Sequence, residues 1–150
     1  MDKYTALIGE EHRTALNSLW AVLNQNRFEP DELLLVLDEE KEFSDELEED
    51  FKLLLENYEL DCSVESCLFS DVETVRHLIE NPEDGFVALD ITSASKHTTA
   101  KLLMDEISRI FDHIFYLEVD DEEEKTNLLP TIECSRVRLL DLKAEQREER

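Results

Sequence analysis

Glycine is nearly absent from this sequence, with two among 150 residues, and neither lies in a glycine-rich loop. Phosphate loops of the P-loop and dinucleotide types need several closely spaced glycines, because the backbone must approach the phosphates. Both motifs are therefore excluded. The chain also lacks a nucleophile elbow and the Cys or His spacing of a metal centre. We expect no metal and no cofactor, and no conventional catalytic constellation.

Cysteine is almost as scarce. Cys62, Cys67 and Cys134 are an odd number, widely spaced and set in apolar segments. This pattern favours reduced core thiols over a disulfide framework or a zinc site. No signal peptide is evident, and no apolar run approaches the roughly 18 residues that a membrane-spanning helix needs. We therefore expect a cytoplasmic protein without membrane contact.

Basic residues are few, since 15 lysines and arginines face 39 aspartates and glutamates, for a net charge of -24. This balance argues against binding duplex DNA or RNA, which requires clustered cations to neutralise phosphates. Acidic runs such as 120–124 are expected on the solvated surface. Two explanations of the acidic bias stay open: halophilic adaptation, in which salt screens self-repulsion, or an acidic surface for a partner. The even spread of charge favours the first.

Hydrophobic residues make up 41% of the chain, enough for a folded core. We expect one domain over residues 1–142 and a frayed polar tail over 143–150. Short apolar runs alternate with segments of helical periodicity. The runs predict strands at 3–8, 33–37, 62–69, 86–91, 114–119 and 137–142. The periodic segments predict helices over 16–23, 47–58, 72–79 and 96–111.

This alternation predicts an α/β fold: a Rossmann-like open sheet of about six strands, mostly parallel, with helices on both faces. The last two strands are too close in sequence for a helix between them, so they are expected to form an antiparallel pair. In such sheets, ligands bind beyond the carboxyl ends of the strands, where the strand order reverses. Three turns are candidates for one site: 9–14, 38–43 and 92–98.

The segment from Gly85 to Thr99 is the most informative of these. A buried strand passes through a Ser/Thr-rich turn into a helix whose first turn holds Lys96. A cation is unfavourable at the positive end of a helix, so a lysine at position 96 indicates that an anionic ligand binds there. His12 and Arg13 give the same, weaker indication. An alternative is purely structural, with Asp90 ordering the loop and the hydroxyl residues capping the helix.

The residues Asp90-Ile91-Thr92-Ser93-Ala94-Ser95-Lys96 fit the pattern Asp/Asn-x-Ser/Thr-x-x-x-Arg/Lys after the fourth strand. In this motif and in its order of elements, the chain resembles the CRISPR-associated Rossmann-fold (CARF) domain family. The resemblance implies a homodimer that binds a cyclic oligoadenylate, each protomer supplying the first-strand and fourth-strand turns. The implied ligand contacts are Gly9, His12, Arg13, Thr14, Asp90, Thr92, Ser93, Ala94, Ser95, Lys96 and His97.

A stand-alone domain of this kind in type III CRISPR antiviral signalling suggests a ring nuclease. In that reaction the ribose 2′-hydroxyl attacks its own phosphate, and the protein aligns the groups and stabilises charge without a metal. Lys96 and His12 are then the catalytic candidates. Two alternatives stay open: a non-catalytic sensor that acts through a separate partner, and a Rossmann-like domain for another nucleotide. His77 and His113 are expected to be ordinary surface histidines.

Overall fold

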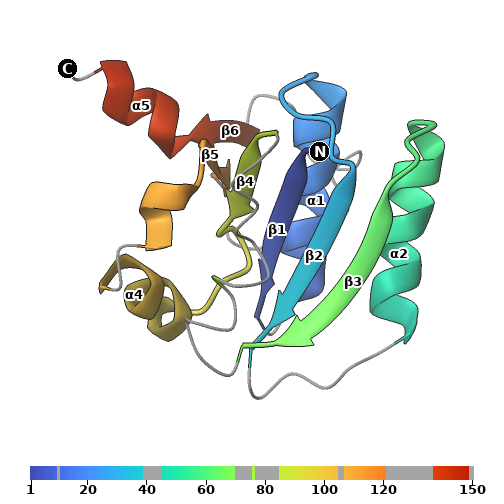
Figure 1. Ribbon diagram of the computed structural model, residues 1–150, viewed down its shortest axis with the longest axis horizontal. Helices are drawn as coiled ribbons and strands as arrows, with labels where there is room; N and C mark the ends of the chain where they lie inside the picture. The colour runs from blue at the N-terminus through green and yellow to red at the C-terminus, as the bar shows by residue number, and fades with distance from the viewer. Residues whose placement is uncertain are drawn as a thin grey trace.

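The computed structural model describes residues 1–9, 11–38, 45–69, 76, 85–104, 107–120 and 137–148. Within them, six strands form one sheet in the order β3-β2-β1-β4-β5-β6 (Figure 1). Neighbouring strands are parallel except β5 and β6, which are antiparallel. The fold class predicted from the sequence is confirmed. The strands are β1 (Lys3–Ile8), β2 (Glu32–Leu37), β3 (Ser63–Leu68), β4 (Val87–Asp90), β5 (His113–Val119) and β6 (Val137–Asp141).

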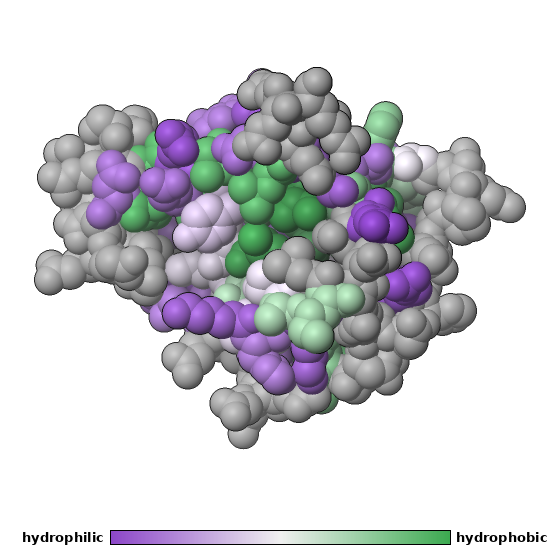
Figure 2. Space-filling view, turned by 90° about the vertical axis from the view of Figure 1, so that its left-hand side faces the viewer, coloured by the Kyte–Doolittle hydropathy of each residue, from purple (hydrophilic) through white to green (hydrophobic). Residues whose placement is uncertain are grey.

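Helices cover both faces of this sheet. Helices α1 (His12–Asn24) and α2 (Asp45–Asn57) pack on one face, where Leu19 and Phe51 meet alternate residues of β1 such as Tyr4. Helix α4 (Lys96–Met104), the 3₁₀ helix η1 (Ile107–Ile110) and helix α5 (Leu142–Glu148) belong to the other face. On that side, apolar side chains show at the centre and hydrophilic ones border them (Figure 2). Two separate cores therefore form, one on each face.

Two expected helices need comment. The segment 96–111, expected to be one helix, contains α4 and the separate 3₁₀ helix η1, with Phe111 buried in the second core. The expected helix at 72–79 lies outside the described residues, apart from Arg76, and so do residues 39–43 of one candidate turn. Residues 121–124 of the acidic connection and Cys134 lie outside them too.

The polar tail is the clearest correction to the sequence-based expectations. Residues 143–148, expected to be frayed, belong to helix α5. The carboxylate of Asp141 explains this order, because it accepts hydrogen bonds from the backbone N–H of Lys143 (3.1 Å) and of Ile114 (3.2 Å). It also pairs with His113 Nδ1 at 2.8 Å. One buried acid thus caps the first turn of α5 and fastens it to β5.

The strand order reverses between β1 and β4, which are parallel neighbours in the sheet. After β1 the chain adds β2 and β3 on one side, and after β4 it adds β5 and β6 on the other. Ala6 lies opposite Asp90 in their shared register. Both strands therefore end at the same edge, and the turns that follow them emerge side by side. This is the position at which doubly wound sheets bind ligands.

Candidate functional site

The turns after β1 and β4 are joined by the hydroxyl of Ser93. Its Oγ accepts a hydrogen bond from the backbone N–H of Gly9 (3.0 Å) and donates one to the carbonyl oxygen of Glu11 (2.9 Å). Gly9 fits only because it has no side chain, since a Cβ there would collide with the carbonyl oxygen of Ser93. The two turns that the sequence predicts to share a site are therefore in direct contact.

Asp90 and Thr92 form the inner part of the fourth-strand turn. Asp90 is fully buried. One carboxylate oxygen accepts from the backbone N–H of Thr92 (2.9 Å) and from its hydroxyl (2.6 Å), while the other accepts from the hydroxyl of Tyr4 (3.2 Å). The hydroxyl of Thr92 in turn accepts from the N–H of Leu117 in β5 (3.0 Å). These two residues thus tie the turn to β1 and β5.

Burial raises the pKa of Asp90 to about 6, despite the hydrogen bonds from Thr92 and Tyr4 and the nearby Ser18 hydroxyl, which lower it. Ser18 Oγ faces this carboxyl from α1 without the geometry of a full hydrogen bond. The pKa of Tyr4 is also raised well above its usual value, first by burial and then by the charge of Asp90. The carboxyl therefore carries a charge that its surroundings only partly compensate.

We expect Asp90→Asn to remove, at neutral pH, the loss of folding stability that the buried charge of Asp90 causes. The folded protein holds the Asp90 proton up to about pH 6, whereas the unfolded chain releases it near 3.8, so the free energy of unfolding falls as the pH rises between these values. Chemical denaturation should show the variant gaining roughly 2–3 kcal/mol on wild type between about pH 4 and pH 7.5. The other carboxylates are the same in both proteins, so their contributions cancel in the difference. A difference that does not change with pH would contradict the assignment.

The outer part of the same turn opens helix α4. Ser95 is its N-cap, because its Oγ accepts from the backbone N–H of Thr98 (3.2 Å). Lys96 and His97 follow as the first two helical residues, and both are exposed. The first turn of α4 holds no acidic residue. A cation therefore stands at the positive end of the helix, as the sequence indicated, and adds to the attraction for an anion.

Helix α1 contributes the remaining predicted residues. Glu11 is its N-cap, with its carboxylate accepting from the N–H of Arg13 (3.4 Å) and its carbonyl from the hydroxyl of Thr14 (2.9 Å). Arg13 is exposed. His12 Nε2 lies 3.3 Å from a carboxylate oxygen of Asp50 in α2. One nitrogen of this catalytic candidate is therefore already engaged by an acid.

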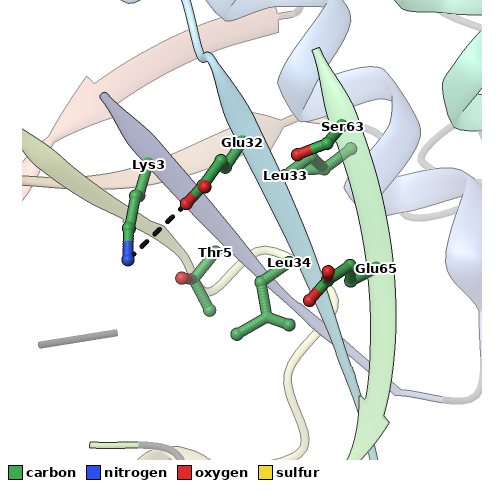
Figure 3. A pocket seen from close by; sticks show the side chains of 7 residues that line it. All are labelled: Lys3, Thr5, Glu32, Leu33, Leu34, Ser63 and Glu65. Atoms are coloured by element: carbon green, nitrogen blue, oxygen red, sulfur yellow. Dashed lines mark ion pairs between the residues drawn. The ribbon is translucent and has the colours of Figure 1, made fainter. Parts of the chain in front are cut away.

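A pocket lies elsewhere, over the amino-terminal halves of β1, β2 and β3 (Figure 3). Its volume is about 220 Å³. Lys3 and Glu32 pair across it at 3.5 Å, and Glu65 points into the same space from β3. Thr5, Leu33, Leu34 and Ser63 complete the lining. This pocket is at the edge opposite the joined turns, and its excess of carboxylates does not suit an anion.

His113 was wrongly expected to be an ordinary surface histidine. It is half-buried, pairs with Asp141 and stacks on Phe115, with ring centroids 5.6 Å apart. No local pattern signals this pair, because it depends on the antiparallel register of β5 and β6. His77 lies outside the described residues.

The described cysteines and acidic clusters add no second centre. Cys62 and Cys67 are free thiols, and burial raises the pKa of Cys62 to about 12 and also raises that of Cys67. Among the described residues, no group of three or more His, Cys, Asp or Glu side chains is placed to hold a metal ion. None of the described helices combines the length and hydrophobicity required to span a bilayer.

Comparison with known proteins supports the fold. No protein-family profile matches the sequence, and no curated protein matches it. Among solved structures, the chain is similar to one described as a type III CRISPR defence DNA nuclease activated by cyclic oligoadenylate, with 15% sequence identity and a TM-score of 0.54. The match covers 97% of this chain but 22% of the nuclease chain. At that identity, the likeness shows the fold.

Proposed function

We propose that this chain is a CARF-like protein that binds a cyclic oligoadenylate at the joined turns after β1 and β4. The observation that carries the proposal is the Ser93 hydroxyl, which links Gly9 and Glu11 and so combines the two predicted turns into one surface. Beside this surface, Lys96 stands exposed at the N-terminus of α4. The nuclease with the similar fold is activated by cyclic oligoadenylate, which supports this class of ligand.

We further propose that the protein slowly opens the ring without a metal. The ribose 2′-oxygen attacks the adjacent phosphorus and the bond from phosphorus to the 5′-oxygen breaks, leaving a 2′,3′-cyclic phosphate and a 5′-hydroxyl. Lys96 and the first N–H groups of α4 would neutralise the charge that develops on the phosphorane. The other ring nitrogen of His12, Nδ1, would accept the 2′-hydroxyl proton, with Asp50 holding the ring.

A non-catalytic sensor is the second candidate, because one observation favours it. Among the described residues, two histidines lie near the joined turns and could act as a general base. They are His12 in the first turn of α1 and His97 in the first turn of α4, and His12 is already paired with Asp50. If that pair is purely structural, His12 would not act as the base, and the surface would bind and align the ligand without the proposed proton acceptor. Signalling would then pass to a separate partner.

Incubation with cyclic tetra-adenylate and cyclic hexa-adenylate, with and without chelator, separates these possibilities. We expect chromatography to show linear products ending in a 2′,3′-cyclic phosphate, formed equally with chelator present. Retention of the intact ring with measurable affinity would support the sensor. Absence of binding to both rings would refute the proposed function, and cleavage abolished by chelator would refute the metal-free route.

The proposed ligand also predicts a homodimer. One shallow surface of two turns cannot surround a ring several nucleotides across, whereas a two-fold copy doubles the surface. The net charge of -24 opposes association, so dimerisation should strengthen as salt rises. Sedimentation at increasing salt measures this. A protein that stays monomeric at high salt and high protein concentration would contradict the shared cleft.

A further inference from the structure

The buried carboxyl of Asp90 lies directly behind the turn proposed to bind the ligand. It is the last residue of β4, and its oxygens accept hydrogen bonds from Thr92 of the turn and from Tyr4 of β1. Thr92 passes the connection on to Leu117 of β5. Asp90 and Thr92 together therefore link the turn to three neighbouring strands, β1, β4 and β5.

No positive charge compensates this carboxyl within the described part of the chain. From β1 it is faced by the Tyr4 hydroxyl, from α1 by that of Ser18, and from β5 by the apolar Phe115. Helix α4 contributes no partner, since Lys96 and His97 are exposed at its start. When it is ionised, Asp90 is a buried negative charge behind a surface for an anion. The two charges repel each other strongly, because buried groups are poorly screened.

We propose that Asp90 is a positioning residue of the ligand-binding turn and that its protonation regulates the site, so that binding the anionic ligand takes up a proton. This inference rests on the proposed function. A protonated Asp90 keeps the geometry, since one oxygen still accepts both bonds from Thr92 while the other donates to Tyr4. The pKa of about 6 makes the protonated form accessible just below neutrality.

Three variants separate charge from geometry. Asp90→Asn is neutral and keeps an oxygen for Thr92, and its amide can donate to Tyr4. Asp90→Ala removes the acceptor and leaves the backbone N–H of Thr92 without its bond. Asp61→Asn is the matched control, because it removes one charge from an exposed residue before β3, at the opposite edge of the sheet.

The affinity for cyclic tetra-adenylate and cyclic hexa-adenylate is measured at about pH 5.5 and pH 7.5, at constant high salt. We expect Asp90→Asn to bind about tenfold more tightly than wild type at the higher pH and about equally at the lower pH. A tenfold change in affinity is the size expected when one repelling charge within roughly 10 Å of the ligand is removed. Asp61→Asn should follow wild type. The histidines are the same in every variant, so the difference between variants isolates the effect of Asp90. Calorimetry in two buffers of different ionisation enthalpy should show proton uptake that Asp90→Asn reduces.

The positioning role is tested in the same experiment. Asp90→Ala should bind more weakly than Asp90→Asn at both pH values, and hydrogen exchange should show faster exchange of the Thr92 and Leu117 amides. Equal binding by these two variants would overturn the positioning role. Parallel pH profiles for wild type and Asp90→Asn would overturn the regulation while leaving the binding function intact. If neither ring binds at any pH, the proposed function fails and this inference fails with it.

Discussion

Replacing Lys96 with alanine is expected to weaken binding of the proposed cyclic oligoadenylate ligand by roughly 1.5–3 kcal/mol, the range for a charge-assisted hydrogen bond to phosphate. Lys96 is exposed at the first position of α4, and the first turn of that helix holds no acid. Removing a cation from the positive end of a helix costs no stability. The variant should therefore melt no lower than wild type while it loses ligand.

The same variant tests catalysis if the protein opens the ring. Once ligand is bound at saturation, single-turnover cleavage should fall by a further factor on the order of a hundred, as for a lost oxyanion donor. Lys52→Ala is the matched control, since it removes one exposed lysine from α2, where the side chain pairs with Glu48 at 3.7 Å. A Lys96 variant that melts early yet binds normally when folded would show that this lysine is structural.

Gly9→Ala is expected to have the largest effect on stability. The added Cβ would collide with the backbone carbonyl oxygen of Ser93, and a backbone atom cannot rotate away as a side chain can. Separating the turns would also lengthen the hydrogen bond from Gly9 N–H to Ser93 Oγ. We expect a loss of about 3 kcal/mol in the free energy of unfolding, together with loss of ligand binding.

Gly85→Ala is the control for this prediction. Gly85 has a φ of 99° and lies against the backbone of Met1, so alanine is strained there too. It is at the amino-terminal edge of the sheet, away from the joined turns. Denaturation and binding measured on both variants should show two unstable proteins, of which only Gly9→Ala fails to bind when folded. Normal binding by Gly9→Ala would mean that contact between the turns is unnecessary.

Local patterns were enough to predict the sheet. The apolar runs at 3–8 and 33–37 coincide with β1 and β2 to within one residue, because buried parallel strands are continuously hydrophobic. The strand before the motif was predicted for the same reason, and the helix after it was predicted from its periodicity, although α4 ends at Met104. Where the periodicity was regular, as in α2, the helix was also predicted.

The roles of single polar residues could not be predicted in this way. An aspartate at a strand end can cap a helix, contact a ligand or link strands through buried hydrogen bonds. Which of these roles Asp90 has depends on Tyr4, which is 86 residues away in the sequence. Ser93 was expected to contact ligand or cap a helix, yet its hydroxyl bridges to the β1 turn. The order of α5 likewise depends on Asp141 reaching β5. Each of these depends on tertiary contacts that a local pattern does not contain.

The attachment of α5 through Asp141 has a practical consequence for fusion proteins. A fluorescent reporter joined directly after Glu148 would continue from a helix whose start is held to β5 by hydrogen bonds from Ile114 and Lys143. The reporter would then keep a defined orientation relative to the sheet, which a flexible linker would not provide. Energy transfer between two such reporters would therefore report the angle between the protomers of the proposed homodimer as well as their association.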